Sequence, residues 1–464
     1  MKINETLQFQ NVGLPEDILR MKQHGDFDNA IKLIDIRLQD ENLPQCLRHC
    51  LQVQREMMVR MPVEFPYSYE EALAIIRAHI PDFSKEEMDW LIAQRKIRWS
   101  YVNGQFRIFN RFFSSLVKAY AGFAKRANQT LPGVESAVGG VPLLDYSMMK
   151  MKESGSMTNR IRIRSTMRVK DEVFEKGMFV RAHLPIPSAC QQQSDISIEK
   201  VYPENGQIAP ENALQRTVCW EENMEENHDF IVEYSYTHTA RYHDLEQEVS
   251  QPGKYDFDLE EQAPHIVFTP YIRALVQELT EGVTDPLQKA RIFYDFITKN
   301  MSYTFMPSYF LLENIPDTCA QNFNGDCGVF ALLFLTLCRC AGIPAQWQSG
   351  LAVEPDFIGG HDWVRFYVEP YGWIFADTSY GVSSMRAKNE ERRQFYFGNL
   401  DPYRMVANSA FAAPFTVDKD FWRADPYDNQ VGEIEYEDRG LIRSELEYSW
   451  ELLECEEHDI HELN

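Results

Sequence analysis

The 464-residue sequence contains no apolar run long enough to cross a membrane, since its longest apolar stretch covers only residues 328–338. Residues 1–20 contain no apolar stretch of the kind found in secretory leaders, so we expect no signal peptide in this chain. These two absences predict a protein of the cytoplasm that does not enter the membrane.

The Cys-x-x-Cys spacing typical of metal-binding and redox-active cysteines is also absent. The nine cysteines are odd in number and widely scattered, and none forms a Cys-x-x-Cys pair, which favours reduced thiols over a disulfide framework. His49 lies beside Cys46 and Cys50, but no second ligand pair follows, so we expect no metal site and no other cofactor. The Asp-x-Asp-x-Asp-Gly pattern of a calcium-binding loop does not occur either.

Basic residues are few: 46 Lys and Arg stand against 70 Asp and Glu, which gives a formal net charge of −24. Because the phosphates of nucleic acids and the surfaces of anionic membranes repel such a protein, we expect neither as a partner. The 44% hydrophobic and 13% aromatic content is typical of a globular protein, and the length predicts two to four domains.

Residues 1–130 are predicted to form a mainly helical domain with one β-hairpin. Apolar residues recur at spacings of three and four, and Ser68 and Ser84 each open a Ser-x-x-Glu capping box. Residues 96–109 alternate around Asn103-Gly104, the signature of a type I′ turn. Helices followed by a hairpin are also found in DNA-binding winged helices, but the overall acidity disfavours that function. For residues 1–130 we hypothesise a lid or propeptide-like role, because they precede the other predicted domains in the chain.

A glycine-containing linker at 129–158 leads to alternating strands, which predict an antiparallel β-sandwich over 159–250. Arg160, Arg162 and Arg164 share one face of its first strand. We interpret this face as solvated, with a substrate-binding strip as the alternative.

The most informative stretch is 325–340, GDCGVFALLFLTLCRC. Polar turn residues precede an apolar run of about three turns, so a buried helix begins here, with Asn324 or Asp326 as its N-cap. Cys327 then lies in the first turn, where the unpaired N–H groups and the helix dipole favour a thiolate. Such a cysteine is either core filler or a nucleophile.

A predicted hairpin follows, with one strand starting at His361, a turn at 370–372 and a second strand ending at Asp377. Alternation places His361 and Trp363 on one face of the first strand. In the hairpin, His361 and Asp377 lie close to opposite each other. A nucleophile, a base and an acid that orients the base therefore occur in order along the chain.

These segments resemble the transglutaminase-like superfamily. The matching pieces are GDCGVFALLFLTLCRCAGIPA at 325–345, HDW at 361–363 and GWIFAD at 372–377, and FGNLDPYR at 397–404 is similar to the tail of bacterial members. The resemblance covers roughly residues 265–405.

The resemblance implies an α+β fold with a papain-like transglutaminase core over 262–430, in which the helix that bears Cys327 packs on an antiparallel sheet. A β-sandwich and the helical domain precede this core, as sandwich domains do in several relatives, and an acidic segment at 431–464 follows. The implied catalytic triad consists of Cys327 as nucleophile, His361 as base and Asp377 as the residue that orients the base.

Further positions follow from the same resemblance. Papain-like enzymes carry an oxyanion-binding glutamine six residues before the cysteine, which is Gln321 here, and the alternative is an ordinary turn glutamine. Gln346 stands where the family commonly has Arg, and Arg365 where an acidic residue is frequent, so substrate preference does not transfer. The predicted substrate-cleft residues are Trp363, Gln346, Arg365 and Trp373.

The implied reaction is attack of a thiolate on an amide carbonyl to give a thioester acyl-enzyme. Release by water makes a cysteine peptidase or amidase, which we favour; release by an amine makes a crosslinking protein-glutamine acyltransferase. A catalytically silent scaffold that binds peptides is the non-enzymatic alternative. The expected partner is a protein or peptide, and the sequence does not indicate an oligomeric state.

Overall fold

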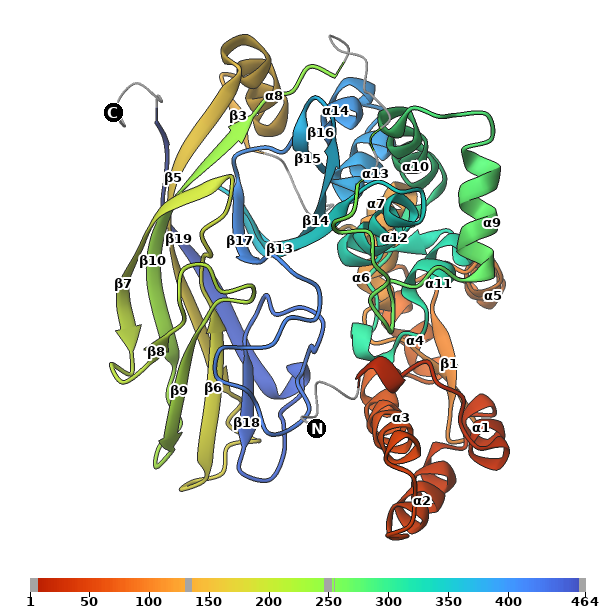
Figure 1. Cartoon of the computed structure of the whole chain (residues 1–464). Coiled ribbons are helices and arrows are strands. Elements are labelled where there is room, and N and C mark those ends of the chain that lie inside the picture. Colours follow the sequence, from red (N-terminus) through yellow and green to blue (C-terminus); the bar gives the residue numbers. More distant parts are fainter. Residues whose placement is uncertain (1–6, 130–135, 246–252, 254, 459–464) are drawn as a thin grey trace. The chain divides into compact units, whose positions relative to one another are not determined.

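The structure is a computed structural model that describes residues 7–129, 136–245, 253 and 255–458 (Figure 1). The chain divides into two compact units, each built from three segments. The first unit comprises Met1–Val134, Glu261–Thr269 and Met301–Val329, and the second comprises Glu135–Glu260, Pro270–Asn300 and Phe330–Asn464.

The first unit is mainly helical. Its N-terminal helices are α1 (Glu16–Gln23), α2 (Phe27–Leu38), α3 (Gln45–Glu64), α4 (Tyr69–His79), α5 (Lys85–Ala93), α6 (Phe112–Ala119) and α7 (Ala121–Arg126). The strands β1 (Trp99–Val102) and β2 (Gln105–Ile108) form a hairpin between α5 and α6. Later segments add β11 (Ser302–Tyr303), a 3₁₀ turn (Tyr309–Leu311), α11 (Ile315–Asn322) and β12 (Asn324–Gly325), with β11 and β12 parallel.

Local signals of the sequence determine the ends of these elements. Ser68 and Ser84 each accept a hydrogen bond from the backbone N–H three residues later, and both capping boxes are complete, as predicted. Asn103 and Gly104 both have positive φ, 49° and 75°, which is the requirement of a type I′ turn and confirms the predicted hairpin.

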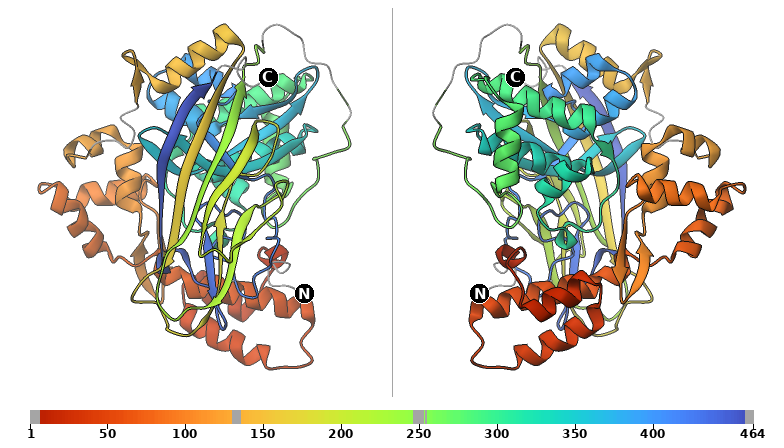
Figure 2. Two further views of the ribbon diagram at one scale, coloured as in Figure 1. Left: turned by 90° about the vertical axis from the view of Figure 1, so that its left-hand side faces the viewer. Right: turned by 90° about the vertical axis from the view of Figure 1, so that its right-hand side faces the viewer.

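A β-sandwich makes up one part of the second unit. One sheet has the order β19-β5-β10-β7 and the other β18-β6-β9-β8. The strands of the first sheet lie side by side in Figure 2 (left). Their bounds are β5 (Ser156–Val169), β6 (Phe179–Pro185), β7 (Gln193–Tyr202), β8 (Gln207–Ile208), β9 (Thr217–Asn223), β10 (Phe230–Arg241), β18 (Glu433–Tyr436) and β19 (Leu446–His458).

The acidic C-terminal segment therefore supplies a strand to each sheet of the sandwich. β19 pairs along β5, and Glu451 accepts a hydrogen bond from Arg164 at 2.5 Å. Arg162 pairs with Glu199 and Glu233, so the arginine face is neutralised by neighbouring strands. Parts of the predicted ranges, 130–135 in the linker, 246–250 in the sandwich and 459–464 at the C-terminus, lie outside the described residues.

The rest of the second unit is an antiparallel five-stranded sheet, of order β16-β15-β14-β13-β17, with helices packed on it. Its strands are β13 (Ala345–Glu354), β14 (Phe357–Val368), β15 (Gly372–Ala376), β16 (Phe397–Gly398) and β17 (Arg404–Asn408). The helices are α9 (Pro270–Leu279), α10 (Pro286–Asn300), α12 (Cys327–Cys340), whose first three residues belong to the first unit, α13 (Thr378–Arg386) and α14 (Glu390–Phe395). Ahead of the sandwich lie β3 (Ala137–Val138), β4 (Val141–Pro142) and α8 (Leu143–Ser154).

The sandwich and the five-stranded sheet share one hydrophobic core. Leu351 and Val353 of β13 and Met405 of β17 belong to the same buried cluster as Trp220 and Tyr234 of the sandwich. This shared core holds the strands that carry the candidate site rigidly against the sandwich. The predicted α+β fold, with a helix on an antiparallel sheet, is confirmed. Among the described residues, no helix is long and apolar enough to cross a membrane.

Candidate active site

Cys327 is the first residue of α12 and is 9% exposed. Asp326 is the N-cap, one of the two residues predicted for this role, because its Oδ1 accepts a hydrogen bond from the N–H of Val329 at 3.2 Å. The hydroxyl of Tyr309 donates to the same oxygen at 2.6 Å. Burial raises the pKa of Asp326, and these two donors partly offset that effect. Asp326 and Tyr309 therefore fix the start of the helix.

Glycine is required directly after the cysteine. A Cβ at Gly328 would lie 2.2 Å from the hydroxyl oxygen of Tyr309, far inside van der Waals contact. The rest of α12 is buried, and the ring of Phe334 packs edge-on against Phe366 of β14 at 5.6 Å. The packing of α12 therefore holds Cys327 in a fixed position at the N-terminus of the helix.

His361 and Asp377 lie on neighbouring strands of the second unit. The β14–β15 ladder ends with Val364 opposite Ala376. The same register places Asp377 beside Trp363, two residues from His361, so the two side chains meet diagonally rather than directly across. His361 Nε2 lies 2.7 Å from Asp377 Oδ2, and both side chains are buried. This bond leaves Nδ1 as the ring nitrogen that can accept a proton.

The Asp377 carboxylate has a second structural role. Its Oδ1 accepts the backbone N–H of Tyr380 at 2.8 Å, which makes Asp377 the N-cap of α13. Because one oxygen caps a helix and the other faces the imidazole, the carboxylate is held in one rotamer. Asp377 therefore directly follows β15 and, as the N-cap, starts α13.

Arg404 completes this network, and the sequence analysis did not single it out. Its Nη1 lies 2.9 Å from Asp377 Oδ2, and its Nε donates to Asp401 Oδ2 at 3.1 Å. The guanidinium is fully buried and lies over the ring of Tyr380 at 4.2 Å. Arg404 falls within the FGNLDPYR stretch, where the Asp-Pro-Tyr-Arg sequence was the available signal.

The buried charges determine the protonation states of the pair. Burial lowers the pKa of His361, while the nearby Asp377 acts in the opposite direction, and the net shift is downward. Burial alone would raise the pKa of Asp377, but His361 and Arg404 lower it below its usual range. The Asp377 carboxylate is therefore charged, and it opposes the effect of burial on the imidazole, which favours uptake of a proton from a thiol.

Aromatic side chains hold the imidazole ring in position. The ring of Tyr380 lies 4.9 Å from that of His361, and the ring of Trp363 lies 5.9 Å from it. Trp363 is fully buried, and its indole N–H donates to Gln348 at 2.9 Å. Trp363 therefore packs beside the base; its role in a substrate cleft stays a prediction.

The other predicted cleft residues form a cluster of their own further along the same strands. Gln346 donates to Asp258 at 2.6 Å and accepts from Arg365 at 2.6 Å. The guanidinium of Arg365 lies 4.9 Å from the ring centre of Trp373. The two positions that depart from the family pattern, 346 and 365, thus bond to each other, and their part in substrate binding stays a prediction.

Gln321 is the next-to-last residue of α11 in the first unit, and it is exposed. Its backbone carbonyl accepts a hydrogen bond from Arg95 Nη1 at 3.3 Å. Within the described part of the chain its side chain has no hydrogen-bond partner. The oxyanion role of Gln321 stays a prediction.

Comparison with known proteins gives a family for the core. Residues 273–378 match the model of the transglutaminase-like superfamily, a segment that contains Cys327, His361 and Asp377. No curated protein matches the chain.

Several solved structures are similar in part. A candidate cysteine protease from Cytophaga hutchinsonii is 16% identical, with a TM-score of 0.42, over 66% of this chain and 92% of that one. The periplasmic domain of TgpA from Pseudomonas aeruginosa is 14% identical, with a TM-score of 0.26, over 54% of this chain and 96% of that one. A candidate protease from Parabacteroides distasonis is 13% identical, with a TM-score of 0.21, over 49% of this chain and 60% of that one.

Proposed function

We propose that this chain, whose residues 273–378 match the transglutaminase-like superfamily, is a thiol enzyme that acts on an amide bond of a protein or peptide. In this proposal Cys327 is the nucleophile, His361 the general base and Asp377 the residue that orients it. The hydrogen bond between His361 Nε2 and Asp377 Oδ2, at 2.7 Å, is the observation that carries the proposal. It fixes the tautomer in which Nδ1 accepts a proton, as a base beside a thiol must.

The charges around the base favour proton uptake. Asp377 and Asp401 are two carboxylates, and Arg404 supplies one positive charge between them. With a neutral imidazole the buried network carries one net negative charge. When His361 takes the thiol proton, the network becomes neutral, which stabilises the imidazolium and hence the thiolate.

Acylation then follows in two steps. The Cys327 thiolate adds to the amide carbonyl, and the oxyanion is bound by the N–H of Cys327 with Gln321 as the second donor. The C–N bond breaks as the His361 imidazolium donates its proton to the leaving amine, which gives a thioester and a neutral imidazole.

Deacylation determines the reaction class. We propose that water is the acceptor: His361 removes a proton from it, hydroxide adds to the thioester, and the carboxylic acid is released as the thiolate leaves. Water needs no binding site of its own, whereas an amine acceptor does. The alternative is attack by a lysine amine, which conserves the acyl bond as an isopeptide crosslink.

The test is to incubate the full chain with casein and the fluorescent amine dansylcadaverine. New amino termini without fluorescent labelling of casein are expected for hydrolysis. Labelling that depends on Cys327 would establish acyl transfer instead. Cys327→Ala is the control, and equal low activity of both proteins on several denatured protein substrates would favour the silent scaffold.

A further inference from the structure

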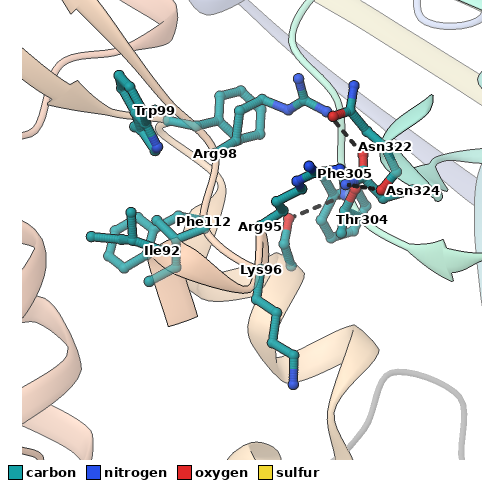
Figure 3. Close-up of a pocket in the computed structure, with 13 residues that line it drawn as sticks. Ile92, Arg95, Lys96, Arg98, Trp99, Phe112, Thr304, Phe305, Asn322 and Asn324 are labelled. Atoms are coloured by element: carbon teal, nitrogen blue, oxygen red, sulfur yellow. Dashed lines mark hydrogen bonds between the residues drawn. The ribbon is translucent and has the colours of Figure 1, made fainter. Parts of the chain in front are cut away.

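The first unit contains a cavity next to its β-hairpin, with a volume of ≈ 160 Å³ (Figure 3). Residues from α5, the hairpin and the segment that leads to Cys327 line it. Those that matter for its chemistry are Arg95, Lys96, Arg98, Trp99, Phe305 and Asn324.

Three cations in four residues surround this cavity, and none of them forms an ion pair with a carboxylate of the described residues. Arg98 Nη2 donates to Asn324 Oδ1 at 3.2 Å, and Lys96 Nζ lies 4.2 Å from the ring centre of Tyr120. Arg95 donates only to a backbone carbonyl.

These three cations have no carboxylate partner among the described residues although the chain has a net charge of −24. Arg181, Arg393 and Arg404, for comparison, each pair with two or more carboxylates. Burial lowers the pKa of Arg98, with Asp326 acting in the opposite direction. Cations held near a cavity without a carboxylate bonded to them provide the donors that a carboxylate ligand requires.

The size and walls of the cavity suit a side chain rather than a large ligand. A volume of ≈ 160 Å³ is similar to that of cavities of about 150 Å³ that bind a benzene-sized group. Trp99, 41% exposed, and Phe305 offer apolar surface beside the cations. An acidic side chain, with a short aliphatic stem and a charged end, matches this combination.

The cavity is also close to the proposed nucleophile along the chain. Asn324, in its wall, is three residues before Cys327 in the same unit. At no more than about 3.6 Å per residue, their Cα atoms are within about 11 Å of each other. A bound peptide with its amide at Cys327 can therefore reach the cavity with a side chain a few residues away.

We propose that this cavity is a subsite for an acidic residue of the peptide substrate, an Asp or Glu near the amide bond that reacts. Arg95 and Arg98 bind the carboxylate, Lys96 adds a third positive charge nearby, and Trp99 contacts the stem of the side chain. The inference rests on the proposed function, because it assigns the cavity to the substrate of Cys327.

The test is calorimetric titration of the full chain, as Cys327→Ala, with two short acetylated and amidated peptides. One alternates alanine with glutamate, and the other has glutamine in place of each glutamate. We expect the glutamate peptide to bind about tenfold more tightly, as charge-assisted hydrogen bonds do relative to neutral ones. Non-specific attraction is not a competing explanation, because the acidic protein repels an acidic peptide overall.

Variants test whether the preference for the glutamate peptide arises at this cavity. In the double variant Arg95→Gln/Lys96→Gln the preference for glutamate should fall to about twofold or less. Lys125→Gln removes one charge from the exposed part of α7, outside the cavity, and should keep the preference. Equal binding of both peptides, or a preference that survives the double variant and Arg98→Gln, would overturn the proposal. Binding is measured without the thiol, so failure of amide cleavage leaves this result unchanged.

Discussion

Replacing Asp377 with Asn tests whether the carboxylate determines the chemistry of Cys327. Three groups face this carboxylate: the N–H of Tyr380 donates to it at 2.8 Å, His361 Nε2 lies 2.7 Å from it, and Arg404 Nη1 forms an ion pair with it at 2.9 Å. An amide has one acceptor oxygen, so its NH₂ group must face one of these donors. If NH₂ faces the imidazole, Nε2 becomes the acceptor and the proton moves to Nδ1. His361 then no longer accepts a proton from a thiol.

The expected size of the effect follows from thiol chemistry. A thiol with an ordinary pKa of about 8.5 is only about 0.3% thiolate near pH 6, whereas a thiolate–imidazolium pair is fully ionised there. The lower nucleophilicity of a low-pKa thiolate offsets part of this difference. We therefore expect iodoacetamide to alkylate Cys327 roughly tenfold more slowly in Asp377→Asn near pH 6, with the difference vanishing near pH 10. Amide turnover should fall by about 10³–10⁴.

The assay follows each cysteine by mass spectrometry, with exposed Cys46 as an internal standard in the same sample. Asp401→Asn is the matched control, because Asp401 also bonds to Arg404 but makes no hydrogen bond to His361. We expect this control to slow alkylation less than Asp377→Asn does, because Asp401 acts on the imidazole through its charge alone. If Asp377→Asn reacts like the wild type across the whole pH range while remaining folded, the reasoning is refuted. If Asp401→Asn slowed the alkylation of Cys327 equally, the effect would come from the total charge of the buried network and not from the bond between Asp377 and His361.

Three further predictions concern stability. Burial and neighbouring carboxylates raise the pKa of Asp425 to about 7, so the folded state keeps a proton that the unfolded chain releases near pH 4. Stability from this group is fully present below about pH 4 and is lost as the pH rises through about 7. Asp425→Asn should gain about 1–3 kcal/mol in urea unfolding near pH 8 and about a third of that near pH 5, and equal effects at both would contradict this. Gly328→Ala should cost about 1–3 kcal/mol because its Cβ meets Tyr309, whereas Gly122→Ala, with nothing within 4 Å, should be neutral or stabilising in the same urea unfolding experiment. Ser84→Ala should cost about 1 kcal/mol by loss of the N-cap, measured by thermal unfolding, and an unchanged midpoint would contradict the capping role.

The features that sequence predicted well are those set by neighbouring residues. The N-cap at Asp326, the Asn103-Gly104 turn and the hairpin that brings His361 to Asp377 each depend on a few adjacent positions. Their physical causes, unpaired N–H groups, positive φ and strand alternation, are all visible in a short stretch of sequence. Even there the register differed by two residues, since the relative shift of two strands depends on their packing.

The pairing of distant strands was not predictable in the same way. β19 pairs with β5, which lies almost 300 residues earlier in the chain. Which strand pairs with β5 depends on which apolar side chains remain exposed after the rest of the sheet has formed. The sequence analysis identified residues 431–464 only as an acidic segment that follows the core. The structure shows why the acidity suits this place: Glu451 faces Arg164 of the neighbouring strand.

Arg404 illustrates the same limit at the candidate site. Nothing in its local sequence says that it reaches a carboxylate 27 positions earlier, because that contact depends on how β17 joins the sheet beside β13. Yet a buried pair of carboxylates, Asp377 and Asp401, without a cation would be strongly unfavourable, since each unpaired buried charge costs several kcal/mol. Asp401 lies between β16 and β17, three residues before Arg404, so the cation that neutralises both carboxylates comes from the segment of Asp401 and not from that of Asp377. Burial is the main cause that lowers the pKa of His361, and Arg404 lowers it further, so a residue that local patterns do not link to Asp377 also contributes to the strength of the base.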